Sequence, residues 1–178
     1  MQAEKACYLY YGENEYLIER KLKESITILK IQHGNIYEEL LSPEIDIDTL
    51  LLMLDTLPLL TQKRIYILKN PIFFDKKMSK LDEIKLVSYF DNPNYETIFI
   101  LILTRTRKNN TLLKNLADRS ESKYYGSVDQ RNQSQILNLW EEQYEKKIDK
   151  NARVYLLDKM KYIPLNILKF SLNDFIPQ

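Results

Sequence analysis

The residues best placed for chemistry lie near the start of the chain, where an apolar, aromatic run ends at Gly12 and passes directly into a helical pattern. A strand, a glycine turn and a helix in this order form the beginning of a phosphate-binding loop. Such a loop also needs a second glycine, a lysine and a hydroxyl residue, in the spacing G-x-x-x-x-G-K-[ST], to hold phosphates and Mg²⁺. Here Gly12 is followed by Glu13, Asn14 and Glu15, and neither the second glycine nor the lysine falls in register. We therefore expect a degenerate phosphate loop, at which Glu13 and Glu15 would repel a triphosphate.

The other parts of a catalytic or metal site are also missing from the sequence. An active P-loop ATPase carries an acidic residue at the end of a core strand to hold Mg²⁺, but the two best strand candidates end in Leu68-Lys69-Asn70 and Leu103-Thr104-Arg105. His33 is the single histidine and Cys7 the single cysteine, which argues against histidine-pair and cysteine-based metal sites. We expect no catalytic residue, no cofactor and no metal, and we interpret Cys7, inside an apolar run, as a buried structural thiol.

Composition narrows the class of protein further. The 178 residues carry 26 basic and 25 acidic side chains, a formal net charge of +1, and this balance argues against a dedicated nucleic-acid surface. No apolar stretch approaches the length needed to cross a membrane, and the first residues do not show a signal-peptide pattern. A single cysteine fits a reducing cytosol. The sequence predicts a cytoplasmic protein without a membrane partner.

The elements that would position these residues alternate between strands and helices up to about residue 128. The segment 97–104 is almost continuously apolar, as expected for a strand covered by helices on both faces. Asn14 is a plausible N-cap for the first helix, and Asp46 or Asp48 for the second. The alternation predicts a largely parallel, doubly wound sheet. We expect strands at 8–11, 36–41, 64–68, 97–104 and 123–125, helices after Asn14, after Asp46 and over 79–90, a loop at 71–74 and a basic loop with a short helix over 105–116.

After Ser127 the pattern becomes entirely helical. Ile136, Leu137, Trp140 and Tyr144 share one helical face, Asp149 starts a further helix, and Pro164 opens a last one. We therefore divide the chain into an α/β domain at 1–128, which holds the degenerate nucleotide site, and a small all-helical domain at 129–178.

Between the second helix and the strand at 64–68 lies the segment Leu57-Pro58-Leu59-Leu60. Pro58 ends the helix and disfavours a helical conformation for the residue before it. Leu59 and Leu60 then lie on a connection, where residues are usually exposed. One interpretation is that the two leucines close the end of the domain. The other is that they form an exposed apolar plug for a partner's pocket, since small apolar anchors supply much of the energy at interfaces.

Four motifs together resemble one family. The opening Tyr-Leu-Tyr-Tyr-Gly-Glu-Asn-Glu-Tyr-Leu-Ile and the segment 57–70 are similar to the first strand and the most recognisable internal stretch of the delta subunit of the bacterial DNA polymerase III clamp loader. Asn92-Pro93 before the apolar strand at 97–103 fits the same family, and Trp140 with the segment 148–152 is similar to the start of its small helical domain. The resemblance covers essentially the whole chain, but only the first half of a full-length member. The collar domain that joins the other subunits is absent from this sequence, so we expect a shortened or abbreviated relative.

This resemblance implies an AAA+-like, P-loop-type fold that has lost its nucleotide site, in a non-enzymatic subunit of the DNA polymerase III holoenzyme. In the family an apolar pair at a tip enters a pocket on the sliding clamp, the beta subunit, and favours ring opening for loading onto DNA. That pair falls on Leu59 and Leu60 here, flanked by Leu57 and Pro58. The family often has phenylalanine at the second position, so Leu60 loses aromatic area. The implied partners are the clamp, the other clamp-loader subunits and, indirectly, DNA.

Charged residues beside the tip segment and after the strand at 97–104 suggest electrostatic support for clamp binding and two alternative functions. Lys63 and Arg64 would add electrostatic steering toward an acidic clamp surface. A second interpretation is a DNA-contacting or nucleotide-binding P-loop-type module, with Arg105, Arg107 and Lys108, and Lys114 farther on, as a basic patch that meets phosphate. A solvated basic loop is the commoner outcome for such a run. A purely structural subunit of a replication complex is the third interpretation, and burial of Leu59 and Leu60 would favour it.

Overall fold

The computed structural model of the protein describes residues 5–57, 63–75, 78–104, 110–127 and 130–160, with side chains in the last range from 133 onward. The chain forms two compact units, Met1–Tyr125 and Gly126–Gln178. Each unit is described by itself below.

The first unit alternates strands and helices, as the sequence predicts. The N-terminal half of the unit contains β1 (Cys7–Gly12), α1 (Glu15–His33), β2 (Tyr37–Leu41) and α2 (Ile47–Asp55). The remaining elements are β3 (Arg64–Lys69), α3 (Ile72–Asp75), α4 (Lys80–Asp91), β4 (Thr97–Leu103), α5 (Thr111–Arg119) and β5 (Glu121–Tyr125).

The five strands form one sheet in the order β2-β3-β4-β1-β5, and every neighbouring pair is parallel. β4 lies at the centre, in register with β1 through Leu9 and Leu101 and with β3 through Ile67 and Ile100. All seven residues of β4 are buried, which explains why its sequence is apolar without alternation. The parallel sheet expected from the sequence is confirmed.

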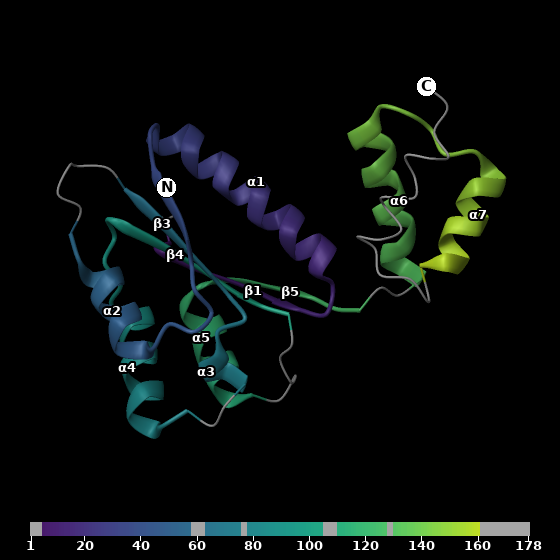
Figure 1. Ribbon diagram of the computed structural model, residues 1–178. Helices are drawn as coiled ribbons and strands as arrows, with labels where there is room; N and C mark the ends of the chain where they lie inside the picture. Colours follow the sequence, from purple (N-terminus) through teal and green to yellow (C-terminus); the bar gives the residue numbers. More distant parts are fainter. Residues whose placement is uncertain (1–4, 58–62, 76–77, 105–109, 128–129, 161–178) are drawn as a thin grey trace. The chain divides into compact units, whose positions relative to one another are not determined.

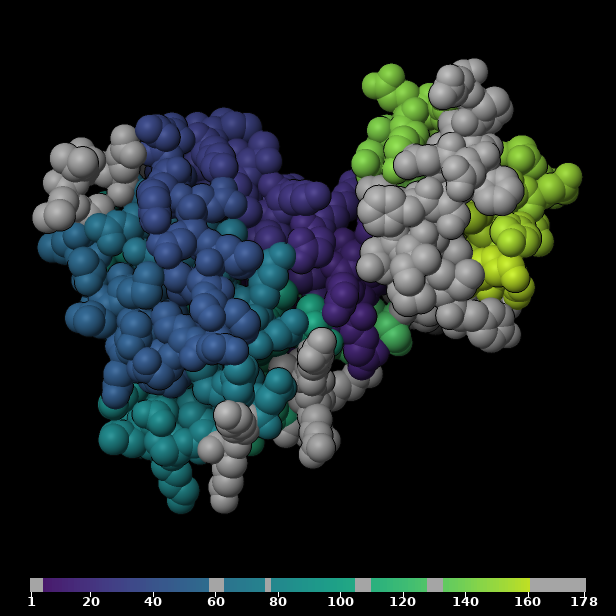
Figure 2. All heavy atoms as spheres, in the orientation of Figure 1, coloured from purple at the N-terminus to yellow at the C-terminus, as the bar shows by residue number. Residues whose placement is uncertain are grey.

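Helices cover both faces of this sheet (Figure 1). On one face α1 packs on alternate side chains such as Tyr10, Ile67 and Ile100. On the other face α2, α4 and α5 lie side by side over a larger apolar cluster that includes Leu9, Leu68 and other residues of the same strands. Ion pairs link these helices through Lys85–Asp48 and Arg119–Asp91. Figure 2 shows the edge strand β2, in blue, facing the viewer between α1 and α2.

Local sequence explains where the helices begin and end. The side chains of Asn14, Asp46, Ser79 and Asn110 each accept a hydrogen bond from a backbone amide in the first turn of the helix that follows. Such caps satisfy amide groups that have no partner inside the helix. α1 ends at His33, and Gly34 follows at a φ of 74° with its amide donating to the Lys30 carbonyl. The expected caps at Asn14 and Asp46 are confirmed.

One expectation was wrong. The segment 71–74 was expected to be a loop, but residues Ile72–Asp75 form a helical turn, α3, and the Phe74 amide donates to the Pro71 carbonyl at 3.0 Å. The rings of Phe73 and Phe74 lie 5.4 Å apart and pack against the larger apolar cluster. Proline suits the position at which a helical turn starts, because its missing amide is not needed there.

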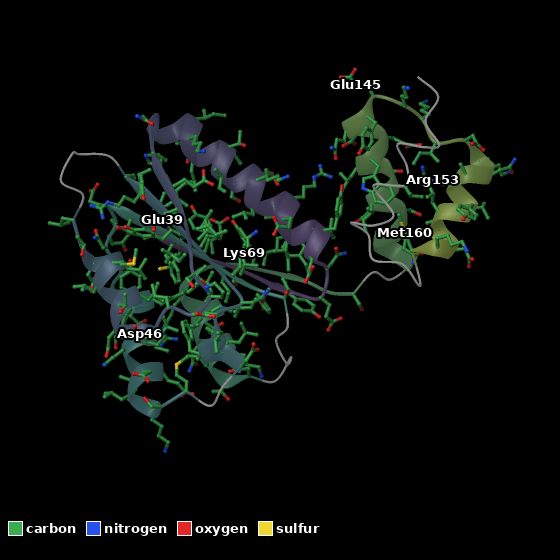
Figure 3. All side chains as sticks on the ribbon, in the orientation of Figure 1. Glu39, Asp46, Lys69, Glu145, Arg153 and Met160 are labelled. Atoms are coloured by element: carbon green, nitrogen blue, oxygen red, sulfur yellow. The ribbon has the colours of Figure 1, made fainter. Side chains whose placement is uncertain are left out.

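The second unit contains α6 (Gln130–Tyr144) and α7 (Lys150–Lys159). Ile136, Leu137 and Trp140 are buried, as expected for a shared apolar face. Asp149 caps α7 through the amides of Asn151 and Ala152. Arg153 of α7, labelled in Figure 3, forms an ion pair with Glu141 of α6 at 3.3 Å. The expected last helix after Pro164 lies outside the described residues.

Candidate functional site

The turn between β1 and α1 is closed by the chain itself. Gly12 has a φ of 131°, and a Cβ atom placed on it would lie 2.0 Å from the carbonyl oxygen of Tyr125, the last residue of β5. No side chain larger than hydrogen fits at that separation, so glycine is required here both by its backbone angle and by this contact. The glycine that looked like the start of a phosphate loop serves the close approach of two strands.

The backbone amides of this turn already have an acceptor. Glu13 and Asn14 both donate to the Tyr125 carbonyl oxygen, at 2.9 and 3.2 Å. In a phosphate loop the amides at this place bind phosphate oxygens. The Leu17 amide donates to the side-chain oxygen of Asn14 at 3.2 Å. Thus, the backbone amides that would bind an anion in a phosphate loop donate instead to oxygen atoms of the chain itself.

An ion pair joins two positions at which the P-loop pattern would place metal-binding groups. In the pattern begun at Gly12, Glu19 falls on the position of the hydroxyl residue, and Lys69 ends β3, where the Mg²⁺-binding acid would be. The Lys69 ammonium contacts the Glu19 carboxylate at 2.6 Å, and Figure 3 labels Lys69. Both side chains are partly exposed, so the pair contributes about 0.2–1 kcal/mol to stability. Glu19 was not among the residues expected to matter, although its register from Gly12 could have identified it.

The ends of β3 and β4 are joined by neutral side chains. Asn70 has a φ of 45°, and its side-chain oxygen accepts the Thr104 amide at 2.7 Å while its nitrogen donates to the Thr104 hydroxyl at 2.9 Å. The Asn70 amide donates to the Ile102 carbonyl at 2.8 Å. Asparagine tolerates this left-handed conformation better than most residues. Asn70 and Thr104 therefore bond to each other, and neither supplies a carboxylate at the end of its strand.

Other candidate groups near the sheet are also occupied or buried. Burial raises the pKa of the Cys7 thiol to about 12, so it stays protonated and is a poor nucleophile. Across the described part of the chain, no group of three or more metal-binding side chains comes together. None of the helices described is long and apolar enough to cross a membrane.

The segment expected to form an apolar tip follows α2. The helix ends at Asp55, and Thr56 takes an extended conformation with φ −67° and ψ 122°, so the chain leaves the helix shortly before Pro58. Leu57 is 67 % exposed. Pro58, Leu59 and Leu60 lie outside the described residues, so their placement stays a prediction.

The residues that follow the tip segment in sequence begin β3. The Lys63 carbonyl accepts the Tyr37 amide at 3.2 Å, which joins the start of β3 to β2. The Arg64 guanidinium donates through Nη2 to the Leu57 carbonyl oxygen at 3.0 Å, and its Nη1 lies 3.4 Å from the Tyr66 hydroxyl oxygen. Part of the hydrogen-bonding capacity of Arg64 is therefore directed at the chain itself.

The expected basic patch is described only at its edge. Arg105, Arg107 and Lys108 lie outside the described residues, and Lys114 is exposed on α5. Contact with DNA through this patch stays a prediction.

Comparison with known proteins identifies one family. A family model described as "DNA polymerase III, delta subunit" matches residues 8–125. Among solved structures, the chain is similar to the Bacillus subtilis DNA clamp loader delta protein YqeN, with a TM-score of 0.60 and 17 % identity over 95 % of this chain and 52 % of that one. A DNA polymerase III gamma subunit-related protein from Thermotoga maritima gives a TM-score of 0.45 and 17 % identity over 89 % and 54 % of the two chains. The search of curated protein sequences finds no match.

The likeness to the B. subtilis protein concerns the fold, and it confirms the expected class of a parallel sheet flanked by helices, with further helices after it. The chain spans about half the length of the solved relatives it matches.

Proposed function

Because this chain belongs to the DNA polymerase III delta subunit family, we propose that it binds the sliding clamp through an apolar tip and promotes opening of the ring for loading onto DNA. The tip consists of Leu57, Pro58, Leu59 and Leu60, with Leu59 and Leu60 as the pair that enters a pocket of the clamp. The clamp and the other clamp-loader subunits are its partners in this proposal, DNA is met within the complex, and the complex acts in the cytoplasm.

The observation that carries the proposal is the exposure of Leu57. Leu50 and Leu54 of α2 are fully buried in the sheet's larger apolar cluster, whereas Leu57, just past the end of the same helix, is 67 % exposed. If this segment served to close the end of the domain, its first leucine would be expected to pack against that cluster. The exposed Leu57 side chain is instead available for contact with a partner, as an apolar anchor of an interface would be.

The same proposal holds that the chain does not hydrolyse ATP. Two contacts within the chain support it. The Tyr125 carbonyl oxygen accepts the amides of the turn, and the Lys69 ammonium forms an ion pair with the Glu19 carboxylate. A triphosphate would have to displace both contacts and approach Glu13 and Glu15, with like charges facing it. The energy for loading would then come from other subunits.

The test replaces both leucines of the tip. We expect Leu59→Ala with Leu60→Ala to weaken clamp binding about 100-fold or more, because two central apolar anchors are removed. The matched control is Leu81→Ala with Ile84→Ala, which removes two exposed apolar side chains of α4, 61 % and 62 % exposed. Affinity for the sliding clamp is measured by titration calorimetry, and the melting temperature of each variant checks the fold.

Two outcomes would contradict the proposal. Unchanged affinity in the tip variant would remove the tip from the interface. Equal losses in the tip variant and in the α4 control would indicate non-specific apolar contact in place of a plug in a pocket.

A further inference from the structure

The parallel sheet ends on one side at β2, an edge strand at the surface. Among the described strands, β2 pairs only with β3, and Figure 2 shows it at the surface between α1 and α2. Two of its residues, Tyr37 and Leu40, are large side chains that are 53 % and 62 % exposed. An edge strand of this kind is a template on which another extended segment can pair.

The register of β2 shows which of its main-chain groups face outward. The Tyr37 amide donates to the Lys63 carbonyl at 3.2 Å, so Tyr37 directs its main-chain groups toward β3. Alternate residues of a parallel strand direct both groups at the same neighbour, so Glu39 does the same. The amides and carbonyls of Glu38 and Leu40 therefore point away from β3. An added strand would meet two donors and two acceptors there.

The side chains of β2 divide between the two faces of the sheet. Leu40 is paired with Ile67 and lies on the face that α1 covers. Glu39 is paired with Tyr66 and lies on the opposite face. A segment added beside β2 would therefore place its side chains alternately beside Leu40 on one face and beside Glu39 on the other.

The charges of this edge favour a basic segment. Residues 35–57 contain six acidic side chains and no lysine, arginine or histidine. Glu38 is neutralised by Lys30 of α1 at 2.6 Å, whereas Glu39, labelled in Figure 3, accepts a hydrogen bond from a neutral tyrosine hydroxyl at 3.0 Å. Glu44 is exposed just past the end of β2. The negative charges of Glu39 and Glu44 would attract lysine or arginine.

The same charges disfavour two other occupants of the edge. A two-fold pair of chains brings the same patch of each together, so two acidic stretches would face each other, and like charges on paired strands are destabilising. Nucleic-acid phosphates would be repelled in the same way. Arg64 of β3 lies on the same face as Glu39, but its described side-chain hydrogen bonds go to the Leu57 carbonyl and the Tyr66 hydroxyl.

We propose that the edge of β2 binds an extended segment of a partner protein as an added strand, one in which apolar side chains alternate with lysine or arginine. The main chain of that segment bonds to the outward groups of Glu38 and Leu40. Its apolar side chains pack beside Leu40, and its basic side chains lie beside Glu39. In this binding mode the main-chain bonds supply affinity and the alternate side chains supply specificity. The site contains no residue of the proposed clamp-binding tip and does not rest on that function.

The probe is a synthetic eight-residue peptide that alternates valine and lysine, titrated into the full chain by calorimetry. Two further versions carry N-methyl groups, one on the valine amides and the other on the lysine amides. An added strand directs one of these two sets of amides at β2 and the other at solvent. We therefore expect one methylated version to bind about tenfold or more weakly and the other to bind as the parent peptide does.

Three outcomes with these peptides would overturn the proposal. Equal affinities of the two methylated versions would show that the peptide does not bind as a strand. Equal affinity of a peptide that alternates valine and glutamate would remove the role of the acidic side chains. Absence of binding by the parent peptide at about 1 mM would remove the site itself.

Variants of β2 place the binding on this edge. Leu40→Pro removes an outward amide that makes no bond to β3, and edge strands tolerate proline at such a position. We expect it to weaken peptide binding about tenfold or more. Leu40→Ala, the matched control, keeps the amide and should cost about threefold. Glu39→Gln should also cost about threefold and lessen the salt dependence.

The melting temperature of each variant checks its fold, and if Leu40→Pro unfolds, the methylated peptides alone decide. Unchanged affinity in folded Leu40→Pro would overturn the proposal.

Sedimentation of the wild type tests the other protein occupant, a second copy of the chain. We expect a monomer at the concentrations used for the titrations. A dimer that Leu40→Pro converts to a monomer would show that a second copy covers β2, and it would overturn the proposal of a basic partner segment.

Discussion

The two ends of the parallel sheet differ in how their functional groups are used. At one end the polar groups bond to other parts of the chain, and at the other end an apolar side chain is exposed. The turn between β1 and α1 lies at one end, and the junction of α2 and β3 lies at the other (Figure 1). At the first end, the amides of Glu13 and Asn14, the Lys69 ammonium and the Asn70 side chain all contact other parts of the chain. At the second end, Leu57 is exposed while its carbonyl is held.

The first end shows how a chain can satisfy the polar groups of such a turn by itself. A backbone amide or charged group left without a partner in a partly buried turn is costly. Here the Tyr125 carbonyl oxygen accepts two amides of the turn, and the Lys69 ammonium contacts the Glu19 carboxylate. An apolar side chain in water has no such requirement of an individual partner, and it remains available to bind a pocket.

The largest effect is expected from Gly12→Ala. The new Cβ would lie 2.0 Å from the Tyr125 carbonyl oxygen, on a backbone with a φ of 131°, so β1 and β5 must separate and the strained angle remains. We expect the free energy of unfolding to fall by about 3 kcal/mol or more, as measured by urea denaturation.

Gly34→Ala is the matched control for Gly12→Ala. Gly34 also has a positive φ, 74°, but no atom lies within 4 Å of the added Cβ, so only backbone strain remains and a cost of about 1 kcal/mol is expected. Equal costs at the two glycines would show that the Tyr125 contact does not close the turn. Folded Gly12→Ala protein should keep its clamp affinity within about twofold, since Gly12 ends β1 whereas Leu57 follows α2 at the opposite end of the sheet (Figure 1).

A smaller effect is expected at Asn70. Asn70→Ala removes the bonds to Thr104 and leaves alanine at a φ of 45°, which should cost about 2 kcal/mol. Asn70→Gly removes the same bonds but tolerates the backbone angle, so about 1 kcal/mol is expected. Urea denaturation of both variants separates the two contributions. A glycine variant as unstable as the alanine variant would show that the backbone angle contributes nothing.

Most of the framework was predictable from local sequence. Apolar runs identified β1, β3 and β4, and Asn14 and Asp46 identified two helix starts, because strand burial and helix capping depend on residues close together in the chain. The helical turn at Ile72–Asp75 was missed, since two phenylalanines after a proline read equally well as a loop.

The contacts that distinguish the two ends were not predictable in this way. The Tyr125 carbonyl reaches Glu13 only because the sheet places β5 beside β1, and Glu19 meets Lys69 across fifty residues for a similar reason. Arg64 was expected to serve as a surface charge, and its bond to the Leu57 carbonyl depends on how α2 returns to the sheet. Such pairings follow from topology, which the local pattern does not specify.

The measurement that tests the central claim most directly is a hydrogen-exchange footprint of the chain with and without the sliding clamp. We predict slower exchange in peptides that cover residues 52–64 and unchanged exchange in peptides that cover 12–19, because the proposed function places the clamp at the first segment, while the second is closed by the chain itself. Protection at 12–19 with no change at 52–64 would contradict the account.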